Sequence, residues 1–422
     1  MLDIKFIRDN LELVKTSIKN RGLKIDLEEI IQIDNSRREV LKELDSLRAK
    51  KNEANREISA LLKAKKDVKP KIAAMKEAAD KIDALEAKLK EINPSLESSL
   101  LNIPNIAHYS VPVGDASKKE ISSSWGKKRD FDFPPVSHIE LAENLDIIDF
   151  PRATKISATN FILYKGWAAK LERALINFML DLHTKKHGYT EIFPPFLVNR
   201  ASMTGTGQLP KLEEDMYRFK DDDLFLIPTA EVPLTNIHRD EILNEEDLPI
   251  YYAAYTACFR REAGSYGKDT KGLIRVHQFD KVELVKFVRP QDSYAELEKL
   301  LQDAREVLQL LDLPYRVIIL PTADISFAAS KCYDLEVYAP GIDKWLEVSS
   351  CSNFESFQAR RANIRFRNKD TKELDFVHTL NGSGIALART MVAILENYQQ
   401  KDGSILVPKV LKPYVDGKER IQ

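Results

Sequence analysis

Cysteine and long apolar runs are scarce in this sequence. Only three of its 422 residues are cysteine, and Cys258, Cys332 and Cys351 match no disulfide or zinc spacing, which favours a reducing compartment. Apolar runs such as Val317–Leu320 are much too short to span a bilayer. The beginning of the chain is charged from Asp3 onward and lacks the apolar stretch of a signal peptide. We therefore expect a cytoplasmic protein with no membrane partner.

The sequence also lacks an excess of charge of one sign. Its 64 Lys and Arg residues and 65 Asp and Glu residues leave a net charge of −1, although charged residues make up 31% of the chain. This balance excludes a globally basic nucleic-acid-binding protein, but it does not exclude a local basic patch. Balanced charge at this density indicates long solvated helices. A chain of this length is expected to fold as two units, one of them large.

Residues 27–100 lack Trp, Phe, Tyr and Gly, and their apolar residues recur at heptad spacing. The recurring positions are Ile33, Val40, Leu47, Ala54 and Leu61 before a short break at 65–70, and Met75, Ile82, Leu89 and Leu96 after it. This pattern predicts two antiparallel helices that bury one seam against each other. They would extend as an arm of roughly 45–60 Å. Pro94 predicts a kink or a new start in the second helix.

The tip of this predicted hairpin is strongly basic. Between Arg48 and Lys76 the sequence has ten basic and three acidic residues, a net charge of +7. Such a surface is either simply solvated or follows phosphates, because clustered cations release counterions from a nucleic-acid backbone. Since no aromatic residue is present, recognition of shape or backbone is favoured over base stacking. The candidate residues are Arg48, Lys50, Lys51, Arg56, Lys63, Lys65, Lys66, Lys69 and Lys71.

After about residue 104 the composition becomes that of a globular domain. Residues 166–187 have the apolar periodicity of a helix, which Gly188 ends, and a short strand then stops at Pro195. His183 and His187 are spaced to bind a metal together on this helix. Because no third ligand is in view, we expect them on a solvated surface instead.

The strongest chemical signal is a pair of β-rich segments, 251–259 and 273–288, which flank a loop rich in glycine and cations. Read with period two, one face of the second segment carries Arg275, His277, Phe279, Lys281 and Glu283. Arginine matches phosphate oxygens, and an aromatic face stacks on a purine, so this hairpin suits a nucleotide. Taken alone, it would equally fit the charged solvent face of an antiparallel sheet.

Two further segments supply groups that a nucleotide site needs. A strand-like run contains Glu347 and Ser350, whose oxygens are suitable ligands for magnesium. A later segment contains Gly382 and Gly384, where the backbone could approach a ligand closely. It leads into a helical pattern in which Arg389 is expected one to two turns from the start.

Together these segments resemble class II aminoacyl-tRNA synthetases and, more narrowly, the bacterial-type seryl-tRNA synthetase family. The helix and strand that end at Pro195 resemble motif 1, residues 259–262 with 275–279 resemble motif 2, and residues 382–389 resemble motif 3. The narrower resemblance rests on residues 204–210, 229–231, 347–350 and 378–383 and on the N-terminal hairpin. One departure is Ala386, where many class II enzymes have a third motif 3 glycine.

The resemblance implies an α+β fold. A class II antiparallel β-sheet domain flanked by helices would occupy residues 111–422, and an N-terminal domain with a coiled-coil arm would occupy residues 1–110. The implied reaction is ATP-dependent activation of L-serine to seryl-adenylate, followed by transfer to tRNA(Ser), and to tRNA(Sec) where the organism has one. The arm would read the long variable arm of the tRNA, and motif 1 would form a homodimer in which the arm of one subunit serves the active site of the other.

The resemblance also implies residue roles, with the charged groups of the site as catalytic residues: Arg260, Arg275, Arg389 and Glu262. The implied serine pocket consists of Thr229, Ala230, Glu231, Glu283, Ser383 and Asn381. The implied ATP site consists of Arg260, Arg261, Glu262, Arg275, Val276, Phe279, Glu347, Val348, Ser349, Ser350 and Arg389. Phe279 would stack on adenine, Arg260 would hold the α-phosphate, and Arg275 and Arg389 the outer phosphates. Glu347 and Ser350 would bind Mg2+.

Two other classes of protein stay open. A non-catalytic synthetase-like protein would bind tRNA or a partner through the coiled coil, but the intact Arg260, Glu283, Glu347 and Arg389 argue against it. An amino-acid ligase that charges a carrier protein would resemble the catalytic domain without the arm, so the hairpin argues against that function.

Overall fold

The chain divides into two compact units. In the computed structural model, which describes residues 1–263 and 271–422, the smaller unit spans Leu2–Pro104. The larger unit spans Asn105–Gln422 together with Met1. The division falls a few residues before the boundary at 110 that the sequence suggests.

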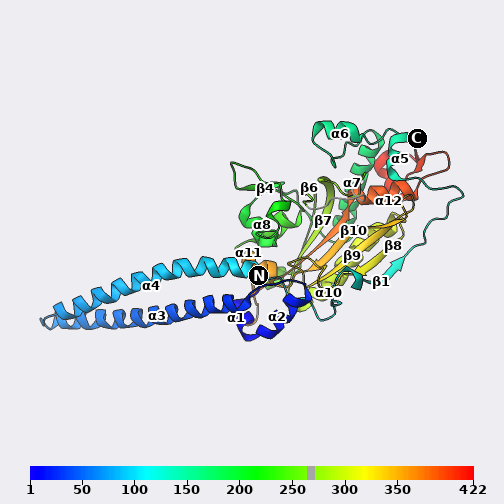
Figure 1. Ribbon diagram of the computed structural model, residues 1–422. Helices are drawn as coiled ribbons and strands as arrows, with labels where there is room; N and C mark the ends of the chain where they lie inside the picture. Colours follow the sequence, from blue (N-terminus) through cyan, green and yellow to red (C-terminus); the bar gives the residue numbers. More distant parts are fainter. Residues whose placement is uncertain (264–270) are drawn as a thin grey trace. The chain divides into compact units, whose positions relative to one another are not determined.

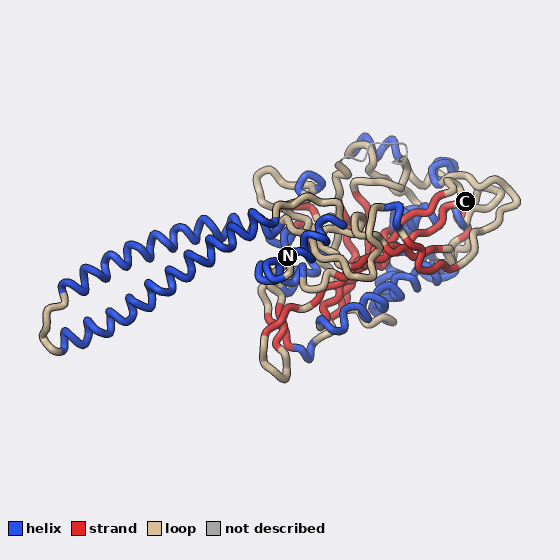
Figure 2. The backbone as a smooth tube through the Cα atoms, turned by 60° about the horizontal axis from the view of Figure 1, so that its bottom comes forward, coloured by secondary structure: helices blue, strands red, loops and turns tan. Residues whose placement is uncertain are grey.

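The smaller unit is built from helices. An aspartate caps the first and third of them: Asp3 accepts hydrogen bonds from the backbone amides of Lys5 and Phe6, and Asp26 accepts one from that of Glu29. The third and fourth helices form the long hairpin drawn in blue and cyan in Figure 1, and Figure 2 shows the short loop that joins them. The helices are α1 (Ile4–Asp9), α2 (Leu11–Asn20), α3 (Leu27–Lys63) and α4 (Lys69–Leu101).

The hairpin buries the seam that the heptad pattern predicts. Val40 and Leu44 of α3 pack against Ile82 and Leu89 of α4. The prediction that a new helix begins at Pro94 is wrong, because α4 continues to Leu101. Buried apolar side chains lie in α4 on both sides of Pro94, at Leu89 and Leu96, and their burial offsets the backbone hydrogen bond that a proline removes.

A large, mostly antiparallel sheet forms the centre of the larger unit, which confirms the predicted α+β fold. The strands lie in the order β1-β8-β9-β10-β13-β7-β6-β2, and among these pairs β2 and β6 run parallel. Their bounds are β1 (Glu120–Trp125), β2 (Thr190–Glu191), β6 (Ile250–Phe259), β7 (Gln278–Val288), β8 (Tyr315–Ile319), β9 (Lys331–Ala339), β10 (Lys344–Asn353) and β13 (His378–Ala386).

Three long helices cover one face of this sheet. They are α7 (Trp167–Lys185), α10 (Ser293–Leu310) and α12 (Leu387–Asn397); α7 contacts the other two, and all three contact the central strands. Their apolar side chains join those of the sheet in the main core; Leu171 of α7, for example, lies in the same cluster as Leu284 of β7. The other face of the sheet, which is the polar one, is left to contact the smaller elements of this unit.

The smaller elements complete this unit. The helices are α5 (His138–Asn144), α6 (Phe150–Ile156), α8 (Arg200–Thr206), α9 (Glu231–Thr235) and α11 (Phe357–Ala362). The short strands are β3 (Leu197–Asn199), β4 (Leu224–Leu226), β5 (Ile242–Asn244), β11 (Arg365–Arg367), β12 (Leu374–Phe376), β14 (Ile405–Leu406) and β15 (Arg420–Ile421). Over the described ranges, none of the helices has both the length and the apolar character that crossing a bilayer requires.

Candidate active site

A cavity of about 460 Å³ lies in the larger unit. This volume is within the usual range for a small-molecule site. The cavity brings together most of the residues that the sequence predicts for the serine and ATP sites. These are Thr229, Glu231, Arg260, Glu262, Arg275, Val276, Phe279, Glu283, Glu347, Val348, Ser349, Ser350, Asn381, Ser383 and Arg389.

Two predicted site residues lie outside this lining. Arg261 donates a hydrogen bond from its guanidinium to the backbone carbonyl of Glu214, at 3.1 Å. Ala230 is fully buried in an apolar cluster with Leu234 and Ala254. Residues 264–270 of the predicted cation-rich loop fall outside the described part of the chain.

Strand β7 supplies one wall of the cavity by simple alternation. Phe279, Lys281 and Glu283 line the cavity, whereas Val282 and Leu284 are fully buried in the main core. The antiparallel pairing of β6 with β7 holds this arrangement in register. The alternation of side chains with period two therefore correctly predicts which residues of β7 face the cavity.

The strand begins at Gln278, so the prediction that it extends from residue 273 is wrong. His277 leaves the cavity wall because its ring packs near Phe161 and its Nδ1 lies 3.0 Å from the carbonyl oxygen of Arg260. Its backbone amide donates to the carbonyl of Asn160, which is outside the sheet. Arg275 lines the cavity from a non-strand segment.

Buried charges gather at one end of the cavity. Lys281 Nζ lies 2.6 Å from Glu283 Oε2 and donates to Thr229 Oγ1 at 2.9 Å. Ser383 Oγ donates to Glu283 at 3.4 Å. Burial, and then the nearby Glu283, raise the pKa of Glu231 to about 7. This end of the cavity can therefore bind a small cation that itself carries hydrogen-bonding groups.

Lys281 is a site residue that sequence reasoning missed. The alternation of side chains along the strand put Lys281 on the same face as Phe279 and Glu283, and this was the sequence signal that pointed to it. Its ion pair with Glu283 arises because alternate residues of one strand share a face. A lysine buried in this way needs such a partner, since an unpaired buried charge is costly.

Three arginines also line the cavity: Arg260, Arg275 and Arg389. The guanidinium of Arg260 lies 5.2 Å from the centre of the Phe279 ring. Arg275 forms an ion pair with Glu262 at 2.9 Å. Phosphate oxygens are the natural ligands of such a group of cations beside an aromatic ring.

Arg389 is held in place by backbone carbonyls. Its Nε donates to Ile274 at 3.0 Å, and its Nη1 donates to Glu347 at 2.9 Å. It is in the first turn of α12, not one to two turns inside the helix as expected, because β13 continues to Ala386.

Strand β10 adds oxygen ligands to the same cavity. The side chain of Glu347 is 49% exposed, and Ser350 Oγ donates to Asp334 Oδ1 at 2.7 Å. Burial, and then Glu347, raise the pKa of Asp334 to about 7. Within the described residues, no group of three or more His, Cys, Asp or Glu side chains is arranged to hold a metal ion.

Gly382 and Gly384 do not have the role expected from the sequence. A Cβ atom at Gly384 would lie 2.7 Å from His183 Nε2, and one at Gly382 would lie 3.0 Å from Cys351 Sγ. Asn381 and Ser383 alternate with them and line the cavity instead. The glycines therefore permit close packing behind the sheet and not the approach of a ligand.

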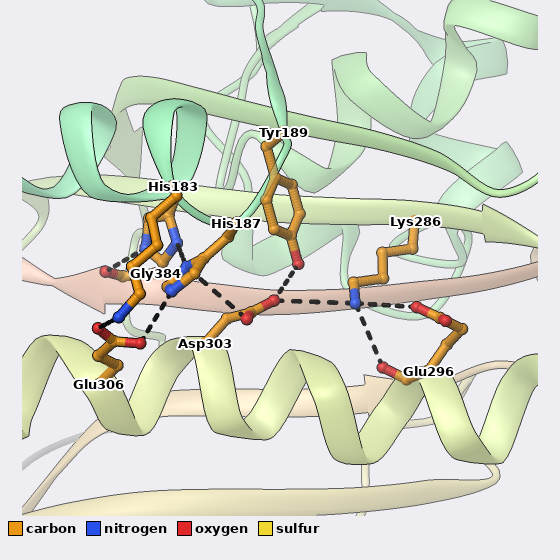
Figure 3. A network of polar contacts seen from close by, with 9 residues as sticks. His183, His187, Tyr189, Lys286, Glu296, Asp303, Glu306 and Gly384 are labelled. Carbon is orange, nitrogen blue, oxygen red and sulfur yellow. Dashed lines mark hydrogen bonds and ion pairs between the residues drawn. The ribbon is translucent and has the colours of Figure 1, made fainter.

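The prediction that His183 and His187 are on a solvated surface is wrong. Figure 3 shows both rings beneath α7, facing α10. Their Nδ1 atoms are 3.0 Å apart, and His187 Nε2 lies 3.1 Å from Glu306 Oε2. Burial lowers the pKa of His183 to about 3. The covering helix is more than a hundred residues away in sequence, so local periodicity could not reveal it.

The same buried network continues along α10. Lys286 of β7 is 1% exposed and lies 3.0 Å from Glu296 and 3.8 Å from Asp303 (Figure 3). Tyr189 donates to Asp303 at 2.8 Å. These contacts tie β7 to α10 on the face opposite the cavity.

The candidate tRNA-binding residues lie on the smaller unit. Arg48 forms an ion pair with Glu86 at 2.7 Å, and Lys71 forms one with Glu57. Lys51 and Lys71 are half-buried, and the other candidates are exposed: Arg48, Lys50, Arg56, Lys63, Lys65, Lys66 and Lys69.

Comparison with known proteins gives matches over both units. A model of the seryl-tRNA synthetase N-terminal domain matches residues 1–107, and one of the tRNA synthetase class II core domain (G, H, P, S and T) matches residues 217–398. The serine–tRNA ligase of Thermodesulfovibrio yellowstonii is 56% identical, over 98% of this chain and 99% of its own length. That of Trichlorobacter lovleyi is 58% identical over the full length of both chains.

Solved structures are similar over the whole chain as well. The seryl-tRNA synthetase of Pyrococcus horikoshii complexed with ATP has a TM-score of 0.92 and 40% identity, covering 100% of this chain and 99% of its own. The cytoplasmic serine–tRNA ligase of Naegleria fowleri in complex with AMP has a TM-score of 0.88 and 29% identity, with the same coverage.

Proposed function

The chain belongs to the seryl-tRNA synthetase family, and we propose that its cavity activates L-serine with ATP for transfer to tRNA in the cytoplasm. The observation that carries this proposal is one cavity with two chemically different ends. One end has the buried carboxylates of Glu231 and Glu283, and the other has Arg260, Arg275 and Arg389. An amino acid fits the first end, and the phosphates of ATP fit the second.

The serine end would bind the ammonium group between the two carboxylates. Glu283 already pairs with Lys281, so its second oxygen and the carboxylate of Glu231 are the natural partners of an added cation. Ser383 and Thr229 offer hydroxyl groups for the serine side chain. A site that hydrogen-bonds a hydroxyl strongly rejects alanine, because alanine leaves those polar groups unpaired.

The ATP end would hold the nucleotide along β7 and α12. Phe279 stacks on one face of the adenine and Arg389 lies against the other face, and Glu262 lies near the adenine. Arg260 binds the α-phosphate, and Arg275 binds the outer phosphates together with Arg389. Arg275 and Glu262 form an ion pair 2.9 Å apart, and the guanidinium of Arg275 would bind Glu262 and the phosphates of ATP together.

Glu347 and Ser350 would hold a magnesium ion. Both line the cavity, and their oxygens are hard donors of the kind that magnesium prefers. Ser350 Oγ donates a hydrogen bond to Asp334 and lies 3.0 Å from Cys332 Sγ, which leaves one Oγ lone pair for a cation. A magnesium ion bound there supplies positive charge to the phosphates of ATP.

The first step needs no general base, because the serine carboxylate is ionised at neutral pH. It attacks the α-phosphorus in line, a carboxylate–phosphorus bond forms, and the bond to pyrophosphate breaks. The arginines stabilise the charge that develops on the phosphates, and the two ends of the cavity position the reactants. In the second step the terminal ribose hydroxyl of the tRNA attacks the seryl carbonyl, and AMP leaves.

The arm would supply the affinity for tRNA. Its basic tip is suited to the phosphate backbone, and a long variable arm is a shape feature that such a surface can recognise. Motif 1, formed by α7 and the strand that follows, would build a homodimer in which the arm of one subunit serves the active site of the other. Where the organism has a tRNA(Sec), the same arm would bind it and the cavity would charge it with serine.

The deciding experiment is the exchange of pyrophosphate into ATP, measured with each amino acid in turn. We expect exchange with serine and very little with alanine or threonine. If no amino acid supports exchange, the chain is a non-catalytic relative and the proposed reaction is wrong.

A further inference from the structure

Gln358 of α11 is a buried amide next to the cavity. It is 1% exposed, and it is not among the residues that line the cavity. Its Nε2 donates to Glu231 Oε1 at 2.6 Å and to the carbonyl oxygen of Thr206 at 3.1 Å. Its Oε1 accepts a hydrogen bond from Thr379 Oγ1 at 2.8 Å. Both ends of the amide are therefore used.

The partners of Gln358 come from three separate segments around the cavity. Thr206 ends α8, Glu231 begins α9, and Thr379 is on β13, two residues before Asn381. A carboxylate and a carbonyl can only accept hydrogen bonds, so the amide nitrogen must face Glu231 and Thr206. The chemistry of the partners thus fixes the orientation of the side chain.

We propose that Gln358 is a positioning residue for amino-acid activation, which aims the carboxylate of Glu231 at the ammonium group of serine. The inference rests on the proposed function, because it assumes that Glu231 binds the amino acid. Lys281 already pairs with Glu283 at 2.6 Å. The amide of Gln358 gives Glu231 a neutral donor that holds the carboxylate without cancelling its charge.

A neutral donor also favours the ionised form of Glu231. Burial and then Glu283 raise the pKa of Glu231, whereas the hydrogen bond from Gln358 and the charges of Lys281 and Arg260 lower it. Without the N–H group, Glu231 would be protonated to a greater extent at neutral pH. A protonated Glu231 no longer attracts the ammonium group of serine.

Two substitutions test this role with opposite responses to pH. Gln358→Met keeps the length of the side chain and removes the donor, so the KM for serine should rise about tenfold at pH 7, and the rise should shrink toward pH 9 as Glu231 ionises. Gln358→Glu places an oxygen against the carboxylate. Its KM for serine should therefore rise further as the pH increases. The KM for ATP should stay within about twofold in both variants.

Gln399→Met is the matched control. Gln399 is also a buried glutamine, 2% exposed, and its amide bonds to Val136 and Glu396 away from the cavity. This variant should lower the melting temperature without changing the KM for serine. A purely structural role of Gln358 predicts the same outcome for Gln358→Met.

The measurements are KM and kcat for serine and for ATP in pyrophosphate exchange at pH 7, 8 and 9, with melting temperatures for every variant. An unchanged KM for serine in folded Gln358→Met, or parallel pH responses of the two variants, would overturn the inference. If Gln358→Met does not fold, the pH response of Gln358→Glu decides. An unaltered protein without serine-dependent exchange would contradict the proposed function itself, which separates the two failures.

Discussion

At the tip of the arm most charged side chains are exposed to solvent, whereas in the cavity the charged side chains are buried. Arg48 and Glu86 of the arm pair with exposed fractions of 52% and 43%, and Lys281 and Glu283 of the cavity pair with 8% and 1%. An exposed pair stabilises a fold by about 0–1 kcal/mol and is screened by salt. Removing one partner of a buried pair costs about 3–5 kcal/mol, because the other charge is left alone.

This difference separates two kinds of recognition. On the arm, each cation is one of many that contribute to the affinity for phosphates, so single residues should be nearly interchangeable. In the cavity, each group has a fixed partner, so single substitutions should have large and specific effects.

The largest effect should come from removing the arm. Deletion of residues 30–98 should abolish the charging of tRNA and leave serine-dependent exchange nearly intact, because the cavity lies within the larger unit. Charging and exchange are measured on the same preparation. Equal loss of both activities would contradict this division of labour.

Within the cavity, Glu283→Ala should have the largest effect of a single substitution. It removes a partner of the ammonium group and leaves Lys281 buried without its carboxylate. We expect kcat/KM for serine to fall about 10³-fold, because the bound ammonium group loses a buried charged partner. This fall is measured by the kinetics of pyrophosphate exchange.

Glu347→Ala is the comparison, because it should affect the use of ATP and magnesium more than it affects the KM for serine. If Glu283→Ala showed the same pattern of effects as Glu347→Ala, the proposal that Glu283 binds serine would be wrong.

A smaller effect is expected from pH. Because the pKa of Glu231 is raised to about 7, its ionised form is lost as the pH falls through 7. The KM for serine should therefore rise about tenfold between pH 8 and pH 6. The KM for serine is measured by exchange across this range. In Glu231→Gln the titrating group is absent, so the profile should become flat; a flat profile in the unaltered protein would rule out Glu231 as the titrating partner.

The sequence revealed those features that depend on local order or on motifs. The heptad rows predicted the seam of α3 and α4 because neighbouring turns of a helix share a face. The family resemblance, through motifs 2 and 3 and the segments around Thr229 and Glu347, identified about half of the residues that line the cavity. Period two was reliable within β7 and failed at His277, which lies before the first residue of the strand.

Contacts between distant segments were beyond sequence reasoning. His183 and His187 are buried because α10 covers them, and Gln358 reaches Glu231 because α11 packs beside α8 and β13. Neither contact leaves a periodic signal. Lys281 lay between two predicted site residues, but only its ion pair with Glu283 shows that it belongs to the buried end of the cavity.

The smallest effect should come from a single cation of the arm. Lys66 is exposed in the loop between α3 and α4, and Lys66→Ala should weaken tRNA binding about two- to threefold while leaving exchange unchanged. The slope of log affinity against log salt should fall by about one, because one fewer counterion is released. Lys90→Ala, which removes an exposed lysine of α4 outside the basic stretch, should change neither quantity. A loss of a hundredfold for Lys66→Ala would mean that this lysine makes a specific contact, and the contrast between a diffuse arm and a precise cavity would then have to be given up.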